Sequence, residues 1–189
     1  NSASIFPADI TLTNQAENLV EDFINWSGGI DLLVNNASSF YPTPIGTITE
    51  AHWNDLIGTN LKGPLFITQA ASKALKKAQG SVINLIDVHT RSPLKDHPAY
   101  SSAKAGLKML TRSLAKDLAP EIRVNGISPG AILWPEDGIS EGAKKSILEQ
   151  IPLNRTGSPQ DIADCVLFLL YQANYITGQI IAVDGGRSI

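Results

Sequence analysis

The sequence has few of the features that mark secreted, membrane or nucleic-acid-binding proteins. It has one cysteine, Cys165, in 189 residues, so no disulfide can form within the chain, which favours a reducing compartment. It shows neither a secretory signal peptide nor an apolar run long enough to span a bilayer. The net charge is −3 and no basic tract occurs, which argues against nucleic acid or an anionic membrane as a partner. We therefore expect a cytoplasmic protein that acts on a small molecule.

The pattern of apolar residues predicts an α/β protein. Hydrophobic residues make up 43% of the chain and charged residues 17%, and the length suits one domain over residues 1–189. Five short apolar runs, expected to be strands, alternate with helical segments. These runs are 3–10, 30–37, 81–87, 122–128 and 179–185. Because the runs are continuous more than alternating, they are typical of strands covered on both faces. The repeated strand–helix units predict a doubly wound parallel sheet in a three-layer α/β/α arrangement.

Several helix signals lie between the expected strands. Residues 13–26 carry apolar side chains at helical spacing. Thr47 and Glu50 form a capping-box signature before the next helix. The segment 158–161 combines an N-cap serine, a proline at the first helical position and an acidic first turn. Cys165 lies in the apolar helical run that follows, where a buried, inert thiol is expected.

The most informative residues are Asp87, Tyr100 and Lys104. If the segment from Tyr100 onward is helical, Tyr100 and Lys104 lie one turn apart on one face. An ammonium there is expected to lower the pKa of the phenol from its usual value of about 10, so that Tyr100 passes a proton near neutral pH. Asp87 ends the apolar run 81–86, which places its carboxylate at the C-terminal end of a strand, where ligands bind in open α/β sheets. A Tyr–Lys pair alone is typical of a helix surface, so the interpretation depends on the other motifs.

Six motifs, in order along the chain, resemble the short-chain dehydrogenase/reductase family. They are Asp9 in A-D-I-T, N-N-A-S at 35–38, Asn60 in T-N-L-K-G, Tyr100-x-x-x-Lys104, P-G at 129–130 and T-G-Q…V-D-G-G at 177–186. The similarity extends over essentially the whole chain, and the Tyr–Lys spacing argues against the enoyl reductase branch. The resemblance implies a Rossmann-type fold with strand order 3-2-1-4-5-6-7 and a nicotinamide dinucleotide cofactor.

A narrower resemblance is to the pteridine reductases, which reduce dihydropterins and, in some members, dihydrofolate with NADPH. The run N-N-A-S-S-F-Y-P-T-P at 35–44 is similar to that branch, and Asp87 stands thirteen positions before Tyr100, where most of the family has a catalytic serine. A serine there would hydrogen-bond a carbonyl oxygen. An ionised Asp87 repels phenolate and keeps Tyr100 protonated, which suits protonation of a ring nitrogen after hydride reaches a C=N carbon. Alternatively, a protonated Asp87 shares a proton with Tyr100.

The resemblance also implies the roles of individual residues around the reaction. Tyr100 donates the proton, Lys104 binds the nicotinamide ribose, and Asn60 holds a water that completes a proton relay. Phe40 stacks on the flat pterin ring opposite the nicotinamide. Ser38 contacts the polar edge of the pterin or the cofactor phosphates.

The remaining implied contacts concern the cofactor and the rim of the site. Asp9 would accept from the adenine amino group, and further cofactor contacts would come from Asn36, Ala37, Ser38, Pro129 and Gly130. Trp134 and Pro135, before the polar run 136–143, are expected to form a mobile flap over the substrate. His89 and His97 are expected to be solvated loop residues, and no metal is expected.

The beginning of the family pattern has no counterpart in the sequence. The first strand, the Gly-rich turn that cradles the pyrophosphate, a helix and the second strand are all missing, and Asn1 falls near the third strand. The run 3–10 would then be separated from its neighbours in the sheet. We expect either that an N-terminal portion precedes Asn1 in the working protein or that the chain is a truncation that does not bind the cofactor normally. The preference for NADPH over NADH rests on resemblance.

Three functions remain open. The leading one is an NADPH-dependent reductase of pterins or dihydrofolate, and the second is a short-chain reductase of another carbonyl or imine. The third is a non-catalytic relative, against which the intact Tyr100, Lys104 and Asn60 argue. The end T-G-Q-I-I-A-V-D-G-G resembles segments that pack between subunits in this family, so a homotetramer is expected.

Overall fold

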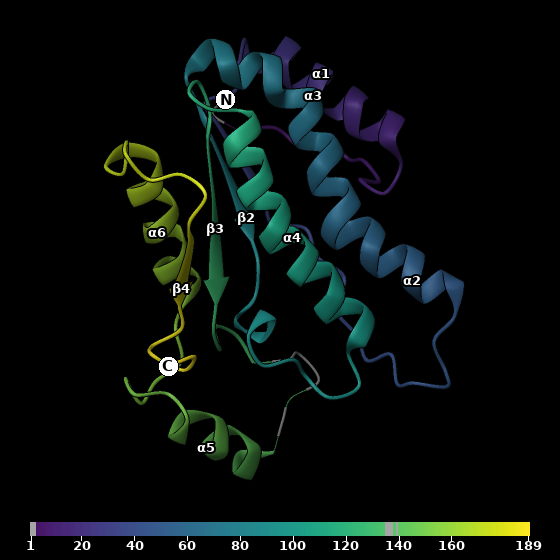
Figure 1. Ribbon diagram of the computed structural model, residues 1–189, viewed down its shortest axis with the longest axis vertical. Coiled ribbons are helices and arrows are strands. Elements are labelled where there is room, and N and C mark those ends of the chain that lie inside the picture. Colours follow the sequence, from purple (N-terminus) through teal and green to yellow (C-terminus); the bar gives the residue numbers. More distant parts are fainter. Residues whose placement is uncertain (1–2, 135–137, 139) are drawn as a thin grey trace.

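A four-stranded parallel sheet forms the centre of the computed structural model, which describes residues 3–134, 138 and 140–189. Its strands lie side by side in chain order: β1 (Leu32–Asn35), β2 (Ser81–Leu85), β3 (Arg123–Pro129) and β4 (Ile180–Val183). The register sets Val34 beside Ile83, and Ile83 beside Asn125. Each strand is joined to the next through helices (Figure 1), which confirms the expected α/β class with a parallel sheet.

The helices connect and cover the strands. In the part of the chain that is described they are α1 (Thr13–Ser27), α2 (Glu50–Ile57), α3 (Gly63–Ala78), α4 (Pro98–Asp117), α5 (Glu141–Glu149) and α6 (Pro159–Tyr171). A π-turn, η1 (Gly58–Lys62), joins α2 to α3, and a 3₁₀ turn, η2 (Val88–Thr90), follows β2. The carboxyl ends of the strands and the first turn of α4 meet at the lower end of the molecule in Figure 1.

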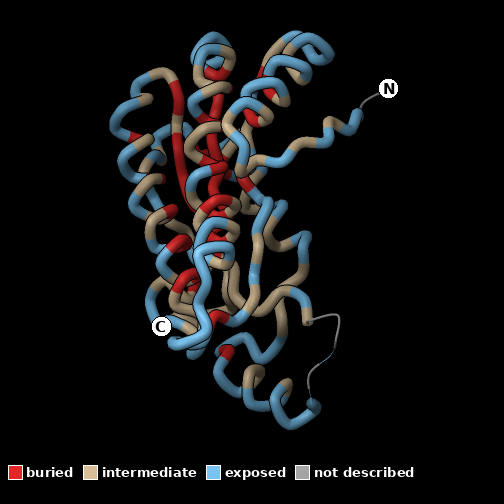
Figure 2. Tube along the Cα trace, turned by 90° about the vertical axis from the view of Figure 1, so that its right-hand side faces the viewer, coloured by how far each residue is buried: buried red, intermediate tan, exposed pale blue. Residues whose placement is uncertain are grey.

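Two hydrophobic clusters hold the three layers together. On one face of the sheet, Val82 and Val124 pack with α1, α3 and α4. On the other face, Ile83 and Ile127 pack with α6, around the buried Leu169. The buried residues follow the strands and the helix faces turned toward them (Figure 2). Cys165 belongs to the α6 layer but is only half-buried, so the expectation of a buried thiol holds in part.

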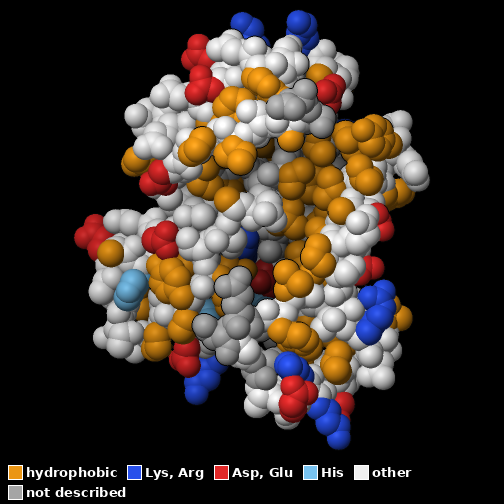
Figure 3. Space-filling model, turned by 180° about the vertical axis from the view of Figure 1, so that it is seen from behind, with side chains coloured by type: hydrophobic (Ala, Val, Ile, Leu, Met, Phe, Trp, Pro, Cys, Tyr) orange, Lys and Arg blue, Asp and Glu red, His pale blue; other side chains and the backbone are white. Residues whose placement is uncertain are grey.

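The α6 side of the sheet is covered unevenly. Helix α6 packs against β3 and β4, whereas Val34 on β1 keeps 38% of its surface exposed. The space-filling view from behind shows hydrophobic side chains gathered over much of this face (Figure 3). An exposed apolar area of this kind is typical of a surface that another part of a protein covers.

The expected strand at 3–10 is wrong. These residues form no regular element, and none of them pairs with β1–β4. Phe6 instead packs edge-on against Phe23 and Trp26 of α1, with ring centroids 5.9 Å apart in both cases. The family order places two strands between this segment and β1, and the described chain contains neither, so the segment has no ladder partner. Phe6 packs on a helix instead, and Ile5 stays 87% exposed.

The caps of two helices test the expected start signals. Helix α2 begins two residues later than Thr47 and Glu50 suggested: Thr49 is the N-cap, and it forms a capping box with His52. The Thr47 hydroxyl instead donates to the carbonyl of Pro44 (2.9 Å). Helix α6 begins as expected, with Ser158 as N-cap.

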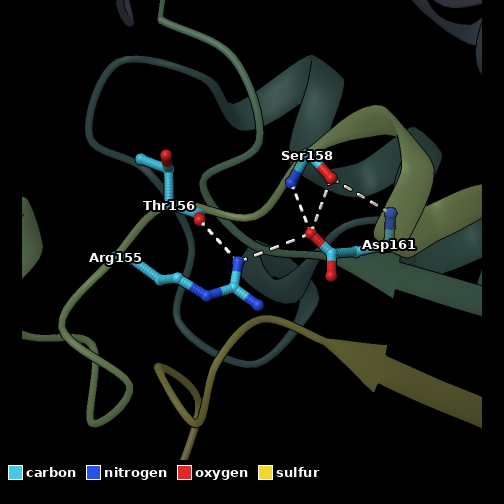
Figure 4. A network of polar contacts seen from close by, with 4 residues as sticks. All are labelled: Arg155, Thr156, Ser158 and Asp161. Atoms are coloured by element: carbon cyan, nitrogen blue, oxygen red, sulfur yellow. Dashed lines mark hydrogen bonds and ion pairs between the residues drawn. The ribbon is translucent and has the colours of Figure 1, made fainter.

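The cap of α6 is a local polar network (Figure 4). The carboxylate of Asp161 accepts from the backbone N–H and the hydroxyl of Ser158, at 2.7 and 2.8 Å, and lies 3.5 Å from the guanidinium of Arg155. These contacts, the Ser158 hydroxyl first, hold the pKa of Asp161 below its usual value. The loop they fix borders a cavity of about 440 Å³ that also contacts Asp184 and Gly185 after β4.

Candidate active site

Asp87 and Tyr100 are in direct contact. The hydroxyl of Tyr100 donates to Oδ2 of Asp87 at 2.7 Å. The other oxygen of Asp87 accepts from the backbone N–H of His89 at 2.8 Å, so the carboxylate caps η2 and its orientation is fixed. Helix α4 begins at Pro98, which places Tyr100 in its first turn, facing the end of β2. The fold therefore brings together the two residues that the sequence singled out.

The environment of Tyr100 favours the protonated phenol. Its side chain is 5% exposed, and burial is the first cause that raises the pKa of Tyr100 well above its usual range. The charge of Asp87 and the hydrogen bond to Asp87 raise the pKa further. The expectation that Lys104 lowers the pKa of Tyr100 is wrong, because burial and the charge of Asp87 raise that pKa. The expectation that Asp87 keeps Tyr100 protonated agrees with the direction found.

Lys104 lies one helical turn after Tyr100, with its ammonium 5.8 Å from the centre of the Tyr100 ring. It is 4% exposed and donates to the carbonyl of Leu85 at 2.9 Å. Burial lowers the pKa of Lys104 to about 8, and the charge of Asp87 acts in the opposite direction. An ammonium has three donors. With one on Leu85, two remain for another ligand.

Asn60 fastens the loop after β1 to the π-turn. Its side-chain amide donates to the carbonyls of Ser39 and Leu56, both at 2.9 Å, and its oxygen accepts from the Ser38 hydroxyl at 2.6 Å. Asn60 is fully buried and makes no hydrogen bond to Lys104. π-turns inside helices occur frequently at functional sites. Here the turn aims an amide at the loop that carries Ser38, and the expected water relay between Asn60 and Lys104 stays a prediction.

Phe40 and His97 form an aromatic stack beside the hydroxyl of Tyr100. The rings of Phe40 and His97 are nearly parallel, 14° apart, with centroids 4.9 Å apart. The rings of Phe40 and Tyr100 meet in a T-shaped arrangement with centroids 4.8 Å apart. Phe40 remains 55% exposed. Nδ1 of His97 donates to the carbonyl of Lys95 at 2.7 Å, which fixes the ring. His97 lies partly exposed in the loop before α4, as expected of a solvated loop residue, and the structure adds its stack on Phe40, which the sequence did not predict. His89 lies in η2, half-exposed, with Nδ1 3.1 Å from the carbonyl of Ser92.

The residues expected to hold a cofactor lie along the carboxyl ends of the strands. Asn36, Ala37 and Ser38 follow β1 and are exposed, and Pro129 ends β3. Gly130 is required by close packing, since a Cβ there would lie 2.7 Å from the backbone of Asp184. The exposed loop after β1 and the free donors of Lys104 fit a polar ligand with hydroxyl and phosphate groups.

Two further expected residues lie at the margins of this edge. Asp9 is exposed, with one carboxylate oxygen bound by the backbone and hydroxyl of Thr11 (2.9 and 2.7 Å). These hydrogen bonds, the hydroxyl first, lower the pKa of Asp9. Trp134 is half-buried, and Pro135 with most of the expected flap lies outside the described residues.

A buried polar network under the site was not anticipated. The amide of Asn35 donates to Asn84 at 2.8 Å and to Thr68 at 3.3 Å, and Asn84 donates to Thr111 at 2.9 Å. This network ties β1 and β2 to α3 and α4. The signal was available in the sequence, because an asparagine inside an apolar strand needs a buried partner.

Two absences can be stated for residues 3–134, 138 and 140–189. No helix there is long and apolar enough to cross a bilayer. No cluster of three or more His, Cys, Asp or Glu side chains suited to a metal ion occurs there.

Comparison with known proteins gives the family. A family model described as enoyl-(acyl carrier protein) reductase matches residues 1–188. A 3-oxoacyl-[acyl-carrier-protein] reductase FabG of Thermotoga maritima is 35% identical, with 96% of this chain and 75% of the relative covered. Pteridine reductase 1 of Leishmania tarentolae is 36% identical, with 95% and 70% covered. A crystal structure described as a short-chain alcohol dehydrogenase of Sinorhizobium meliloti 1021 superposes with a TM-score of 0.91 at 33% identity, covering 96% of this chain and 75% of that one.

The chain belongs to the short-chain dehydrogenase/reductase family and is an oxidoreductase of that family, whose members use a nicotinamide dinucleotide. The description of the family model names the branch against which the four-residue spacing of Tyr100 and Lys104 argues. The match therefore establishes the family, and the substrate has to be inferred from the site.

Proposed function

We propose that this chain is an NADPH-dependent reductase of dihydropterins or dihydrofolate. The observation that carries the proposal is the carboxylate of Asp87 on the hydroxyl of Tyr100 at 2.7 Å, where a ketone reductase of this family is expected to have a serine. The similarity to a pteridine reductase supports it. The exposed ring of Phe40, 4.8 Å from the Tyr100 ring, adds a flat surface on which a pterin can stack.

Different residues of the chain bind the cofactor, orient the substrate and position the loop after β1. The free donors of Lys104 and the exposed backbone at Asn36–Ser38 would hold the dinucleotide, which supplies a hydride to the substrate carbon when bound. Phe40 and His97 orient a flat ring above Tyr100. Asn60 keeps the Ser38 loop in place through its three hydrogen bonds. Positioning of this kind accounts for much of the rate enhancement in two-substrate reactions.

Tyr100 supplies the proton. Its O–H bond breaks as an N–H bond forms on the ring nitrogen next to the reduced carbon. The raised pKa of Tyr100 ensures that the proton is present at neutral pH. In the structure the hydroxyl of Tyr100 donates this proton to the carboxylate of Asp87, so the substrate nitrogen must replace Asp87 as the acceptor. Alternatively, Asp87 and Tyr100 share the proton as a coupled pair. The ammonium of Lys104 stabilises the phenolate that remains, because opposite charges attract strongly in a buried site.

A second candidate is the reduction of a 3-oxoacyl thioester. The FabG relatives, at 35% identity for Thermotoga maritima and 39% for Aquifex aeolicus, favour it. It requires a hydrogen bond from the protein to a carbonyl oxygen. The hydroxyl of Tyr100 can donate to that oxygen, but Asp87 stands where a serine hydroxyl would add a second donor, which makes this candidate weaker.

The test is a comparison of substrates with the purified protein. NADPH oxidation is measured with dihydrobiopterin, dihydrofolate and a 3-oxoacyl thioester, for the parent, for Asp87→Ser and for Asp117→Ser as a control on α4. We expect the parent and the control to reduce the pterin, and Asp87→Ser to lose at least about tenfold in kcat, within the range of positioned acid–base groups, with its affinity for NADPH unchanged. A parent that reduces the thioester and ignores pterins and folates would contradict the proposal.

A further inference from the structure

A second polar cleft lies beside the candidate active site and is not part of it. It has a volume of about 100 Å³. Its walls come from η2, α4, β3, β4 and the C-terminal segment, namely Val88, Thr90, Arg91, Lys108, Arg112, Ser128, Gln179, Ile180, Ala182 and Ser188. Asp87, Tyr100, Lys104 and Phe40 do not line it. None of the residues expected to hold the dinucleotide lines it either.

The cleft carries a concentration of positive charge in a chain whose net charge is −3. Arg91, Lys108 and Arg112 line it, and none of its lining residues is Asp or Glu. Within the described part of the chain, none of the three cations has a carboxylate within ion-pair distance. Lys108 and Arg112 are one helical turn apart, where like charges destabilise a helix. A bound anion would remove this repulsion.

Two residues of the cleft, Arg91 and Ser188, are held in place by a hydrogen bond between them. The guanidinium of Arg91 donates to the carbonyl of Ser188 at 3.2 Å, and its charge also acts on Asp184. The carboxylate of Asp184 lies outside the cleft, where the backbone N–H groups of Gly186 and Ser188 bind it, both at 2.9 Å. Arg91 thus has a defined position and keeps donors free for a ligand.

A serine hydroxyl supplies a further donor in the cleft. Ser128 on β3 is 6% exposed, lines the cleft, and its side chain makes no hydrogen bond with the described residues. The neighbouring hydroxyl of Thr90 is committed, since it donates to the carbonyl of Asp87 at 2.9 Å. The hydroxyl of Ser128 therefore remains free to donate to a ligand in the cleft.

We infer that this cleft binds a tetrahedral oxyanion, inorganic phosphate or the phosphate group of an ester. Guanidinium, ammonium, amide and hydroxyl donors converge there, and planar guanidinium groups match phosphate oxygens in pairs. The volume admits one such group and excludes a dinucleotide. Because Thr90 and Arg91 adjoin the turn that Asp87 caps, an anion in the cleft would also hold that turn. The inference does not depend on which substrate the enzyme reduces.

Calorimetric titration of the purified protein with sodium phosphate, in chloride buffer of constant ionic strength, tests the inference. The variants are Lys108→Gln with Arg112→Gln, and Ser128→Ala. Lys116→Gln is the matched control, because Lys116 is an exposed cation on the same helix outside the cleft. We expect saturable binding by the parent, at least about tenfold weaker in the double variant and weaker in Ser128→Ala, as for the loss of charge-assisted hydrogen bonds. The control should match the parent.

Two parallel titrations define the chemistry of the ligand. Phenyl phosphate that binds as inorganic phosphate does identifies a site for phosphate esters, and weaker binding of the ester identifies a site for the free ion; both support the inference. Acetate that binds as tightly as phosphate would overturn the assignment of a tetrahedral anion. The inference also fails if the parent shows no saturable phosphate binding, or if Lys116→Gln loses as much affinity as the double variant. Circular dichroism of each variant establishes that it is folded.

Discussion

At the scale of single residues, the hydroxyl of Tyr100 is the group on which the proposed chemistry depends. It is the phenol in contact with Asp87, and its raised pKa keeps it protonated. We predict that Tyr100→Phe lowers turnover at least about 10²-fold, the low end for a positioned acid, while folding and NADPH binding persist. Steady-state kinetics and a binding titration measure both. Turnover within a few-fold of the parent would remove Tyr100 from the mechanism.

Lys104 gives a prediction about pH and stability. Burial lowers its pKa to about 8, below the ordinary value of 10.5 that applies in the unfolded chain. Below pH 8 both states bind the proton, and the folded protein bears the full cost of burying the charge. Between about pH 8 and 10.5 the unfolded state binds more protons, so stability rises with pH. Lys104→Met should therefore stabilise the protein at pH 7 by more than it does at pH 10.

Denaturant unfolding of the parent and of Lys104→Met at the two pH values measures this difference. Lys116→Met, at an exposed position on the same helix, serves as the control and should show no such dependence on pH. A stabilisation by Lys104→Met that stays equal at both pH values would contradict the lowered pKa.

The aromatic stack predicts how the substrate is oriented. Phe40→Ala removes a stacking face and apolar area, so we expect pterin binding to weaken by roughly one to two factors of ten. His97→Ala should weaken it less, and His97→Phe should restore it, since a second flat ring keeps Phe40 in place. The measurement is the KM for dihydrobiopterin, with Ile45→Ala, 83% exposed in a nearby loop, as the control. Unchanged KM values in all variants would exclude stacking as the source of affinity.

At the scale of elements, the sequence predicted what depends on local pattern. The strands β1–β4 coincide with the four later apolar runs, with β3 continuing one residue beyond its run to Pro129, because a continuous apolar run marks a strand covered on both faces. The prediction of a strand at 3–10 was wrong because a strand also needs neighbouring strands to pair with, and the local sequence pattern does not show whether they are present. The N-cap of α2 is Thr49 and not Thr47, because Thr49 and His52 form a competing capping box two positions further along the chain. The stack of His97 on Phe40 joins two loops distant in sequence, and no spacing rule predicts such a contact.

The cap of α6 gives a prediction for an element. Ser158→Ala removes the hydroxyl that both accepts from the N–H of Asp161 and donates to its carboxylate. Loss of an N-cap costs about 1 kcal/mol, which corresponds to about 2–4 °C in Tm for a chain of this size. Thermal unfolding measures the loss, and Ser158→Thr, which keeps the hydroxyl, should recover most of it. A Tm unchanged by Ser158→Ala would show that the cap is not needed.

At the scale of the whole molecule, the outer face of α6 bears on assembly. Leu167, Phe168 and Tyr171 are 49%, 42% and 71% exposed on that helix. An apolar patch of this kind is typical of a protein interface. We expect the homotetramer proposed from the resemblance to use it, so that Phe168→Glu with Tyr171→Glu yields smaller species in sedimentation velocity. Ile45→Glu, a charge placed elsewhere on the surface, should sediment as the parent does. A parent that is monomeric at all concentrations would contradict the assembly.

The buried amide pair between the first two strands has a consequence for how faithfully the sheet aligns. Asn35 meets Asn84 only in the observed register, and a slip by one residue would turn each amide toward the opposite layer. Two unpaired buried amides would then cost about 1–3 kcal/mol each. The same slip would separate Ser38, which follows β1, from the end of β2 that carries Asp87. A misaligned chain thus loses both stability and the arrangement of the active-site residues. The asparagine pair therefore selects one strand register, which a uniformly apolar sheet would not do.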